Sequence, residues 1–313
     1  MMDKPLISVI IPTYKRSNFL PRAIKSVLDQ TYTNFEIVVI DDNNPNSEYR
    51  KQTEKLMGEF ENNPRIIYIQ HDHNKGAAAS RNTGIYNCSG QYIAFLDDDD
   101  VCTKDRLKKQ YSVFEQNRNN DKLALVYCYS IIKSNNLFSR DFINKRTYCG
   151  NCVYEFMYDG CIAATSQWMC KKSVLLELNG FKSMPSKEES DMMFRILLSG
   201  YTIDYYPEAL VTYNNHPGEH LSGTSMKQIE AEKIMLQECR REYWRLNSTQ
   251  ILTVEIAYSK RLYWLYKQNC CYPEMKKVAY FLRKTGATSF LAMIIINRLK
   301  KIKHLILSSA NHD

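Results

Sequence analysis

This sequence lacks any apolar run of the roughly 18–20 residues that a membrane-spanning helix requires. The longest candidate, 290–296, is short and is followed by four basic residues between 298 and 303. The chain also lacks internal repeats and low-complexity tracts, and its first residues lead into a strand-like run rather than a signal peptide. We therefore expect a folded protein of the cytoplasm.

Paired metal-binding cysteines are also missing. The ten cysteines are scattered, and the C-x-x-C formed by Cys149 and Cys152 is followed by no second pair at the spacing of a zinc ribbon. This C-x-x-C does not sit early in a βαβ unit either, where a thioredoxin-like redox pair would lie. We interpret the cysteines as reduced and mostly buried.

A net positive charge is absent from most of the chain. Residues 1–225 hold 26 Lys+Arg and 27 Asp+Glu, whereas residues 226–313 hold 16 and 7, so the net charge of +8 comes from the C-terminal part alone. Such asymmetry indicates an anionic partner, a membrane surface or nucleic acid, or else only a solvated helical face.

The first 130 residues alternate apolar strand-like runs with helical spacing, a pattern typical of βαβ units around a mostly parallel sheet. The chain is long enough, at 313 residues and 44% hydrophobic, for such an α/β domain plus an appendage. Strands are predicted over 6–11, 35–40, 65–69, 92–96 and 123–129, and helices over 19–30, 47–61, 77–86 and 104–116.

The remainder of the chain has a different pattern. Residues 131–225 are less regular, with one clear helix over 188–198, and from 227 onward only helices are predicted. We expect one α/β domain over 1–225, in halves of about 1–130 and 131–225, and a basic helical region over 226–313. Its predicted helices span 227–246, 250–268, 273–285 and 289–307.

Polar residues gather where the predicted strands end. In an open α/β sheet, ligands bind beyond the carboxyl ends of the strands, so these residues are expected to face one crevice. They are Thr13, Tyr14, Lys15 and Arg16 after the first strand, Asp41 and Asp42 after the second, His71, Asp72 and Lys75 after the third, and Asp97, Asp98, Asp99 and Asp100 after the fourth.

The run of four aspartates is the sharpest feature of the sequence. Adjacent carboxylates repel one another unless a positive group is present, and a hard divalent cation with oxygen ligands removes that cost. Asp97 and Asp99 could share one ion, which could also bind two phosphate oxygens. The alternative is an acidic turn before a helix.

Other strand-end residues allow nucleotide contacts. Asp41 and Asp42 could bind a base or ribose or merely form a turn, and Tyr14 could stack on a base or only cover the sheet edge. Lys75 and Arg81 supply positive charge near phosphates, although Arg81 could instead make a structural ion pair.

Two features later in the chain suit chemistry. Glu188, Glu189 and Asp191 crowd a helix start, where the dipole favours the ionised form that a general base needs, or where they only stabilise the helix. His216 and His220 lie in a Gly/Pro loop that could close over a ligand, or are simply exposed.

Several of these segments, in this order, resemble family-2 glycosyltransferases over about 6–225. Ser8–Arg16 and Ser26–Tyr32 look like the opening of that family, and Phe35–Asp42 continues the match. The remaining segments are Lys75–Gly84, Gly90–Asp100, Asn179–Phe181 and Glu188–Arg195.

The resemblance implies a GT-A fold, a nucleotide-sugar donor and inversion at the anomeric carbon. It places Pro12, Thr13, Tyr14, Arg16, Asp41, Lys75 and Arg81 around the donor. Asp42 matches a uracil-binding aspartate, Asp98 a residue near the ribose, and His216 a loop histidine on the diphosphate. Asp97 and Asp99 match the D-x-D metal pair for Mn²⁺ or Mg²⁺, with Asp99 preferred as the direct ligand.

Glu189 matches the catalytic base of the family, but with a departure. That base is usually the aspartate of a Glu-Asp pair, and here the pair is Glu188-Glu189, so Asp191 is a rival. The implied reaction is a single displacement in which the base takes a proton from an acceptor hydroxyl. Glu188 and Trp168 are acceptor-side candidates, although Trp168 could equally be buried.

The acceptor is expected to be a glycan or a lipid-linked glycan. Residues 290–307 are predicted to lie at an anionic membrane surface, apolar side inward, or to pack as an ordinary helix; no nucleic-acid partner is expected. A nucleotidyltransferase would carry a Gly-rich loop with Arg after the first strand, and a dehydrogenase would carry G-x-G-x-x-G there, but this sequence has neither motif. A receiver-like binding module would be shorter than this chain.

Overall fold

The computed structural model describes residues 4–133, 141–214 and 226–286. They divide into two compact units, one comprising 1–156 and 161–220 and the other 157–160 and 221–313, and each is described separately. No described helix is both long and apolar enough to cross a membrane.

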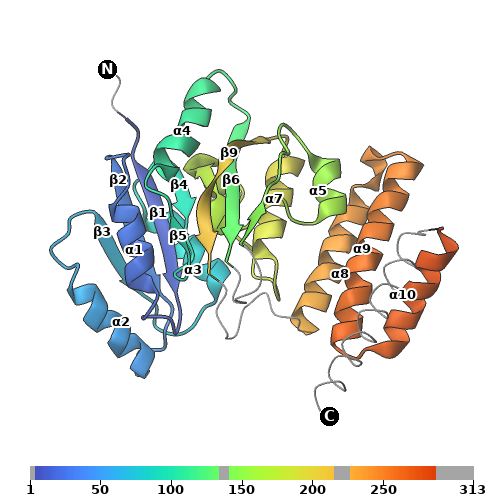
Figure 1. Ribbon diagram of the computed structural model, residues 1–313, viewed down its shortest axis with the longest axis horizontal. Coiled ribbons are helices and arrows are strands. Elements are labelled where there is room, and N and C mark those ends of the chain that lie inside the picture. The colour runs from blue at the N-terminus through green and yellow to red at the C-terminus, as the bar shows by residue number, and fades with distance from the viewer. Residues whose placement is uncertain (1–3, 134–140, 215–225, 287–313) are drawn as a thin grey trace, which may run out of the picture. The chain divides into compact units, whose positions relative to one another are not determined.

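The larger unit is built on one sheet with the strand order β3-β2-β1-β4-β8-β6-β9-β5 (Figure 1). The strands β3, β2, β1 and β4 are mutually parallel, as predicted, whereas β8 is antiparallel to both β4 and β6, and β5 is antiparallel to β9. The sheet is therefore mixed beyond β4. The strands are β1 (Ile7–Thr13), β2 (Phe35–Asp41), β3 (Ile66–Gln70), β4 (Tyr92–Phe95), β5 (Val101–Cys102), β6 (Leu123–Ile132), β7 (Phe142–Asn144), β8 (Met169–Lys171) and β9 (Thr202–Tyr213).

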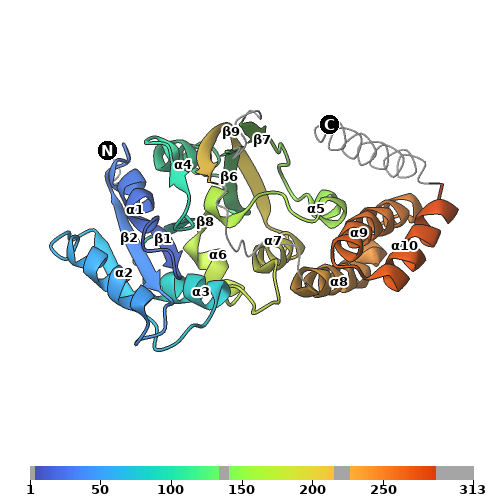
Figure 2. The same ribbon diagram turned by 60° about the horizontal axis from the view of Figure 1, so that its bottom comes forward.

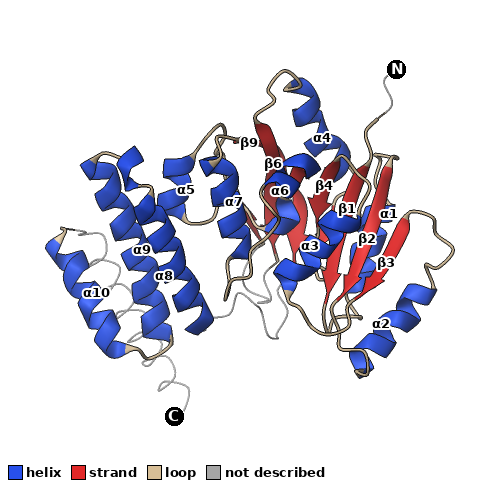
Figure 3. Ribbon diagram, turned by 180° about the vertical axis from the view of Figure 1, so that it is seen from behind, coloured by secondary structure: helices blue, strands red, loops and turns tan. Residues whose placement is uncertain are grey.

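Helices cover both faces of this sheet (Figures 1 and 3). On one face, alternate residues of β1 and β2 share a core with α1 and α4. On the other face α3 lies close to β1, because a Cβ at Gly84 would come within 2.5 Å of the Ile10 side chain. The helices of this unit are α1 (Leu20–Leu28), α2 (Glu48–Gly58), α3 (Ala77–Asn87), α4 (Arg106–Gln116), α6 (Lys172–Glu177) and α7 (Glu188–Leu198). The helix α5 (Val153–Asp159) begins in this unit, and its residues from 157 onward belong to the second unit.

The second unit contains three helices within its described residues: α8 (Met226–Arg241), α9 (Ser248–Gln268) and α10 (Tyr272–Lys284) (Figure 2). Asn247 caps α9 by accepting the Gln250 N–H, and Pro273 stands in the first turn of α10. Inside this unit Arg261 pairs with the buried Glu232 and donates to the carbonyl of Tyr158 at 2.7 Å. The predicted helix 289–307 lies outside the described residues.

All ten cysteines are free, so no disulfide supports either unit. Cys88, Cys128, Cys152, Cys170 and Cys239 are buried, whereas Cys149 and Cys270 are exposed. The core must therefore come from apolar burial between sheet and helices alone.

Candidate active site

The ends of β1 and β4 bring the acidic run beside Thr13 and Arg16. The two strands are parallel neighbours, with Ile10 opposite Phe95. The Thr13 hydroxyl donates to Asp98 Oδ2 at 2.7 Å, and Arg16 Nη1 lies 2.5 Å from Asp99 Oδ2 and 3.4 Å from Asp98 Oδ1. Strand order therefore groups residues that are more than 80 positions apart in the chain.

Three further side chains form hydrogen bonds with the backbone of the acidic run. Ser166 Oγ accepts the N–H of Asp97 at 3.0 Å, while Arg22 and Asn214 each donate to the carbonyl of Asp99 at 2.9 Å. The sequence did not reveal these three residues. Arg22 has the appearance of an ordinary polar position on a helix, and the other two come from the irregular stretch after 131.

The run carries more negative charge than its surroundings accommodate. Burial is the main cause that raises the pKa of Asp98 to about 7, and the charges of Asp99 and Asp97 add to it, against the opposing effects of Thr13 and Arg16. Burial, and then the charge of Asp97, also raises the pKa of Asp100 well above its usual value. Ionisation of Asp98 and Asp100 is therefore costly in this site, and a nearby cation would lower that cost.

These residues suit a divalent cation only with additional oxygens. The described residues contain no group of three or more His, Cys, Asp or Glu side chains disposed to hold a metal by themselves. Asp97 has a 35% exposed side chain and can offer a ligand oxygen, and Asp99 is 12% exposed. Two carboxylates plus phosphate oxygens would match the hard oxygen ligands that Mg²⁺ and Mn²⁺ accept.

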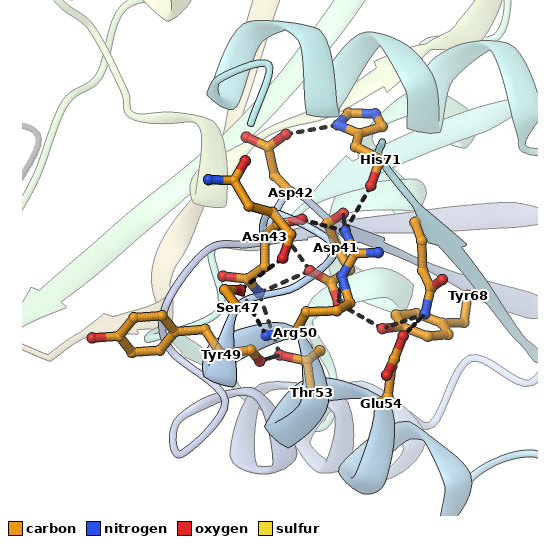
Figure 4. A network of polar contacts seen from close by, with 12 residues as sticks. Asp41, Asp42, Asn43, Ser47, Tyr49, Arg50, Thr53, Glu54, Tyr68 and His71 are labelled. Carbon is orange, nitrogen blue, oxygen red and sulfur yellow. Dashed lines mark hydrogen bonds and ion pairs between the residues drawn. The ribbon is translucent and has the colours of Figure 1, made fainter. Parts of the chain in front are cut away.

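Asp41, at the end of β2, is in a very different state (Figure 4). Its carboxylate is fully buried, accepts from the Asn43 N–H at 2.9 Å and the Tyr68 hydroxyl at 2.6 Å, and lies 3.0 Å from Arg50 Nε. The contact with the nucleotide-sugar donor that is predicted for Asp41 is therefore not available, because its buried carboxylate already has these protein partners. It acts instead as the anchor of Arg50, which donates to the His71 carbonyl at 2.7 Å.

Asp42 organises the loop that follows β3. One carboxylate oxygen accepts from His71 Nδ1 at 2.7 Å and from the Lys75 N–H at 2.8 Å. The other accepts from Asn74 Nδ2 at 3.0 Å and from the Gly76 N–H at 2.8 Å. Four protein donors thus occupy the carboxylate predicted to bind uracil, so a base could reach Asp42 only by displacing one of them.

Lys75 is tied locally as well. Its ammonium pairs with Asp72 at 2.9 Å, and the Lys75 side chain is 36% exposed. That pairing, with burial opposing it, lowers the pKa of Asp72. The ion pair lies at the protein surface, where it is worth little, so the Lys75 ammonium can turn toward a phosphate at small cost.

Arg81 joins the acidic run to the start of α7. From α3, its guanidinium lies 3.0 Å from Asp97 Oδ1 and 3.2 Å from Glu188 Oε1, and it lies over the Phe181 ring at 5.6 Å. Arg81 is only 6% exposed, and its Nε has no hydrogen-bond partner among the described residues. The Arg81 guanidinium therefore lies between Asp97, a candidate metal ligand, and the pair Glu188-Glu189, which contains a candidate catalytic base.

Glu189 and Asp191, the two candidate bases, have opposite surroundings. Burial and the charge of Glu188 raise the pKa of Glu189, which forms no ion pair within 4.0 Å with a Lys or Arg of the described residues. Asp191 lies 2.7 Å from Arg195 Nε and 3.7 Å from Lys182 Nζ. Glu189 is thus the carboxylate left available for proton transfer.

The ion pair of Asp191 has a structural purpose. Arg195, held by Asp191, donates to the carbonyls of Leu178 and Gly180 at 2.6 Å each. Gly180 has φ +66°, and a Cβ there would meet Asn82 Oδ1 at 2.3 Å. Asp191 and Arg195 therefore fix the turn that leads to α7 and to the two glutamates at its start.

The remaining predicted residues lie as follows. Pro12 is in β1 and Tyr14, which directly follows that strand, is 38% exposed, with Lys15 Nζ 5.0 Å from its ring centroid. Trp168 has no exposed surface and donates its indole N–H to the Ala163 carbonyl, so it packs in the core and cannot stack on a sugar. His216 lies outside the described residues.

Comparison with known proteins agrees with the resemblance seen in the sequence. The family model described as Glycosyl transferase family 2 matches residues 8–178, more than half of the chain. This confirms the family and the class of enzyme predicted from the sequence.

Two relatives illustrate the range of similarity. An uncharacterized glycosyltransferase of Methanocaldococcus jannaschii is 27% identical over 78% of this chain and 81% of its own length. The UDP-Glc:alpha-D-GlcNAc-diphosphoundecaprenol beta-1,3-glucosyltransferase WfgD of Escherichia coli is 35% identical over 44% of this chain. The chain spans about half, 51%, of the length of WfgD.

Two solved structures share the fold. TarS of S. aureus, residues 1–349 in complex with UDP-GlcNAc, has a TM-score of 0.60 and 15% identity, covering 89% of this chain and 91% of that one. The mannosyltransferase PcManGT of Pyrobaculum calidifontis, in complex with GDP-Man and Mn²⁺, has a TM-score of 0.60 and 16% identity, covering 95% and 81%. These likenesses confirm the predicted GT-A fold.

Proposed function

Because the chain belongs to glycosyl transferase family 2, we propose that it transfers a sugar from a nucleotide diphosphate to a hydroxyl of a glycan or lipid-linked glycan acceptor, with inversion. The observation that carries this proposal is the bridge through Arg81. It links the acidic run, which suits a diphosphate and a cation, to Glu188 and Glu189, which suit a base. Residues 1–225 would form the catalytic domain, with the donor over about 1–130 and the acceptor over 131–225.

The donor is proposed to be a UDP-sugar that lies along the ends of β1 and β4. Asp98 would face the ribose and Tyr14 the base, with Arg16, Lys75 and the loop of His216 near the diphosphate. The UDP donor named for WfgD and the UDP-GlcNAc bound by TarS support this choice, whereas PcManGT binds GDP-Man.

A divalent cation, Mn²⁺ or Mg²⁺, would be held by Asp97 and Asp99 together with phosphate oxygens. When bound, it would neutralise the negative charge of the departing diphosphate. The raised pKa values of Asp98 and Asp100 support a cation here, because they come first from burial and then from the charges of neighbouring aspartates, and a bound cation would oppose both effects.

Glu189 would remove the proton from the acceptor hydroxyl as that oxygen attacks the anomeric carbon. A raised pKa suits this role, since a base works best when its pKa lies close to the working pH. Arg81, paired with Glu188, would hold that side chain in place beside Glu189. Asp191, paired with Arg195, would position the turn and take no part in the proton transfer.

The acceptor side is proposed to include Glu188 and the neighbourhood of α7. A lipid-linked acceptor would bring the enzyme to the inner face of the cytoplasmic membrane, and the name of WfgD supports an acceptor of that type. Contact through 290–307 stays a prediction, since that segment lies outside the described residues.

The proposal is tested by donor turnover. Purified protein is incubated with a panel of UDP- and GDP-sugars in Mn²⁺, and the released nucleoside diphosphate is measured with and without acceptor. We expect slow release from one donor that accelerates with acceptor. Pyrophosphate release from sugar phosphate and nucleoside triphosphate would instead indicate a nucleotidyltransferase, and binding without turnover a non-catalytic module.

A further inference from the structure

The solvent-facing side of α10 combines exposed tyrosines with basic residues. Tyr272 and Tyr280 are 55% and 64% exposed, and four basic side chains of the helix are exposed with them. These four are Lys276, Lys277, Arg283 and Lys284. Together the six residues are called the α10 face.

Helical geometry puts these residues on one side. At 3.6 residues per turn, positions 272, 276, 280 and 283 or 284 follow one another along a helix surface. The opposite side packs on α9 through Leu282, Met275 and Val278, of which Leu282 is fully buried. The single acidic residue of α10, Glu274, lies away from the line of the two tyrosines.

The charge of this face is concentrated and unpaired. Residues 226–286 hold 12 Lys+Arg and 6 Asp+Glu, a net charge of +6, and α10 alone contributes 4 and 1, or +3. None of the four basic side chains of the α10 face forms an ion pair with a described residue. This contrasts with α8 and α9, where Arg240 and Glu255 pair at 2.7 Å.

We propose that the α10 face docks on an anionic phospholipid surface. Tyrosine is an amphipathic side chain suited to the headgroup level, and lysine and arginine are attracted to anionic lipid. Tyr272 and Tyr280 lie eight residues apart, about 12 Å along the helix axis. A flat surface can therefore contact both tyrosines at once.

A nucleic acid is the competing anionic partner. Proteins that hold single strands do so in a positively charged groove with stacked aromatics, whereas the α10 face is one side of a single helix. The docking of α10 is distinct from the contact predicted for 290–307. It also does not depend on the sugar donor, so its test can fail while glycosyl transfer stands.

The test is co-flotation of the full-length protein with vesicles of phosphatidylcholine alone or mixed with 30% phosphatidylglycerol. We expect binding to the anionic vesicles only, and its loss in 1 M NaCl, because salt screens the attraction. The Lys276→Glu/Lys284→Glu variant is expected to bind at least about tenfold more weakly. Donor hydrolysis by this variant should equal that of the wild type.

Matched controls separate the α10 face from overall charge. Lys227→Glu/Lys233→Glu removes the same charge from exposed positions of α8, and we expect less than a twofold change in binding. Tyr280→Ser should weaken binding several-fold, whereas Tyr86→Ser, at a 57% exposed tyrosine of the other unit, should not.

Three results would overturn the proposal. They are no binding of the wild type to anionic vesicles, equal losses in the α10 and α8 double variants, and binding to a single-stranded oligonucleotide under conditions where vesicles are not bound. A fourth result would also overturn it: wild-type-level binding in the α10 double variant that is lost only when residues 287–313 are deleted would assign the contact to that segment.

Discussion

Two aspartate clusters, at the ends of β2 and β4, look alike in the sequence and differ in the folded protein. Asp41 and Asp42 are buried, and donors from the protein occupy their oxygens. The run Asp97–Asp100 is also largely buried, and there burial, with the charges of neighbouring aspartates adding to it, raises the pKa values of Asp98 and Asp100. The first cluster is neutralised by the fold, and the second is left with charge to neutralise.

The same difference separates the two carboxylates of α7. Asp191 is paired with Arg195, while burial and Glu188 raise the pKa of Glu189. A carboxylate whose partners are all supplied by the protein stabilises the structure. A buried carboxylate with an unmet demand for positive charge or for a proton is a candidate for chemistry.

The largest effect is expected at Glu189. Glu189→Gln removes the proton acceptor and should lower the turnover number about 10²- to 10⁴-fold with little change in donor affinity. Asp191→Asn should mainly lower stability, with turnover per folded molecule within about tenfold. Steady-state kinetics on both variants decides between them. Near-normal turnover in Glu189→Gln together with an inactive, folded Asp191→Asn would reverse the assignment.

The next effect is expected at Asp99. Asp99→Asn should lower turnover about 10²- to 10³-fold, comparable to the loss of a group that stabilises transition-state charge. Its melting temperature without ligand should stay equal or rise, because one of the crowded carboxylates is gone. A variant that loses activity only in proportion to its unfolded fraction would place Asp99 with Asp41 as a structural residue.

Asp41 is expected to behave in the opposite way. Asp41→Asn leaves the guanidinium of Arg50 buried without its counter-charge, which costs about 3 kcal/mol of unfolding free energy. Urea denaturation measures this loss, and kinetics at low temperature should find near-normal turnover in the folded fraction. Asp29→Asn, at an exposed surface pair with Lys25, serves as the matched control. Equal stability of the two variants would contradict the comparison.

The last expected effect is a dependence of the unfolding free energy on pH. The pKa of Asp98 is about 7 in the folded protein against an ordinary 3.8, so the folded state holds this proton more tightly between those values. This contribution to the free energy of unfolding is fully present below pH 3.8 and is lost as the pH rises through about 7. Between these values the slope is at most about 1.4 kcal/mol per pH unit. Unfolding measured from pH 4 to 8 should therefore slope less in Asp98→Asn than in the wild type. If the two curves of unfolding free energy against pH run parallel, folding does not raise the pKa of Asp98.

The sequence predicted the first half of the fold well because each element there is a simple pattern. Buried parallel strands such as Phe35–Asp41 appear as nearly continuous apolar runs. In the second half, only α7 has a pattern that predicts its observed bounds. The strand β9 was missed. It contains Pro207 at a shift in register against β6, and half-buried tyrosines and threonines interrupt its apolar pattern.

The site was predicted in its members more than in their roles. The strand ends predict Asp41, Asp42 and Asp97–Asp100, but the side chains that distinguish them lie elsewhere in the chain. Tyr68 and His71 donate to Asp41 and Asp42 from 27 and 29 positions away, and Ser166 accepts the N–H of Asp97 from 69 positions away. Pairing between distant side chains leaves no local signal. Arg81 was likewise placed near phosphates, and its bridge to Glu188, 107 residues away, became visible only in the fold.

The central claim, that Asp97–Asp100 is where a nucleotide diphosphate and a cation bind together, is tested most directly by thermal shift. Wild-type protein and Asp97→Asn/Asp99→Asn are melted with UDP-sugars, with Mn²⁺, and with both. We predict that Mn²⁺ and the cognate nucleotide sugar together raise the melting temperature of the wild type by more than the sum of their separate effects, and that the variant loses this excess. An equal joint shift in the variant, or none in the wild type across the panel, would contradict the account.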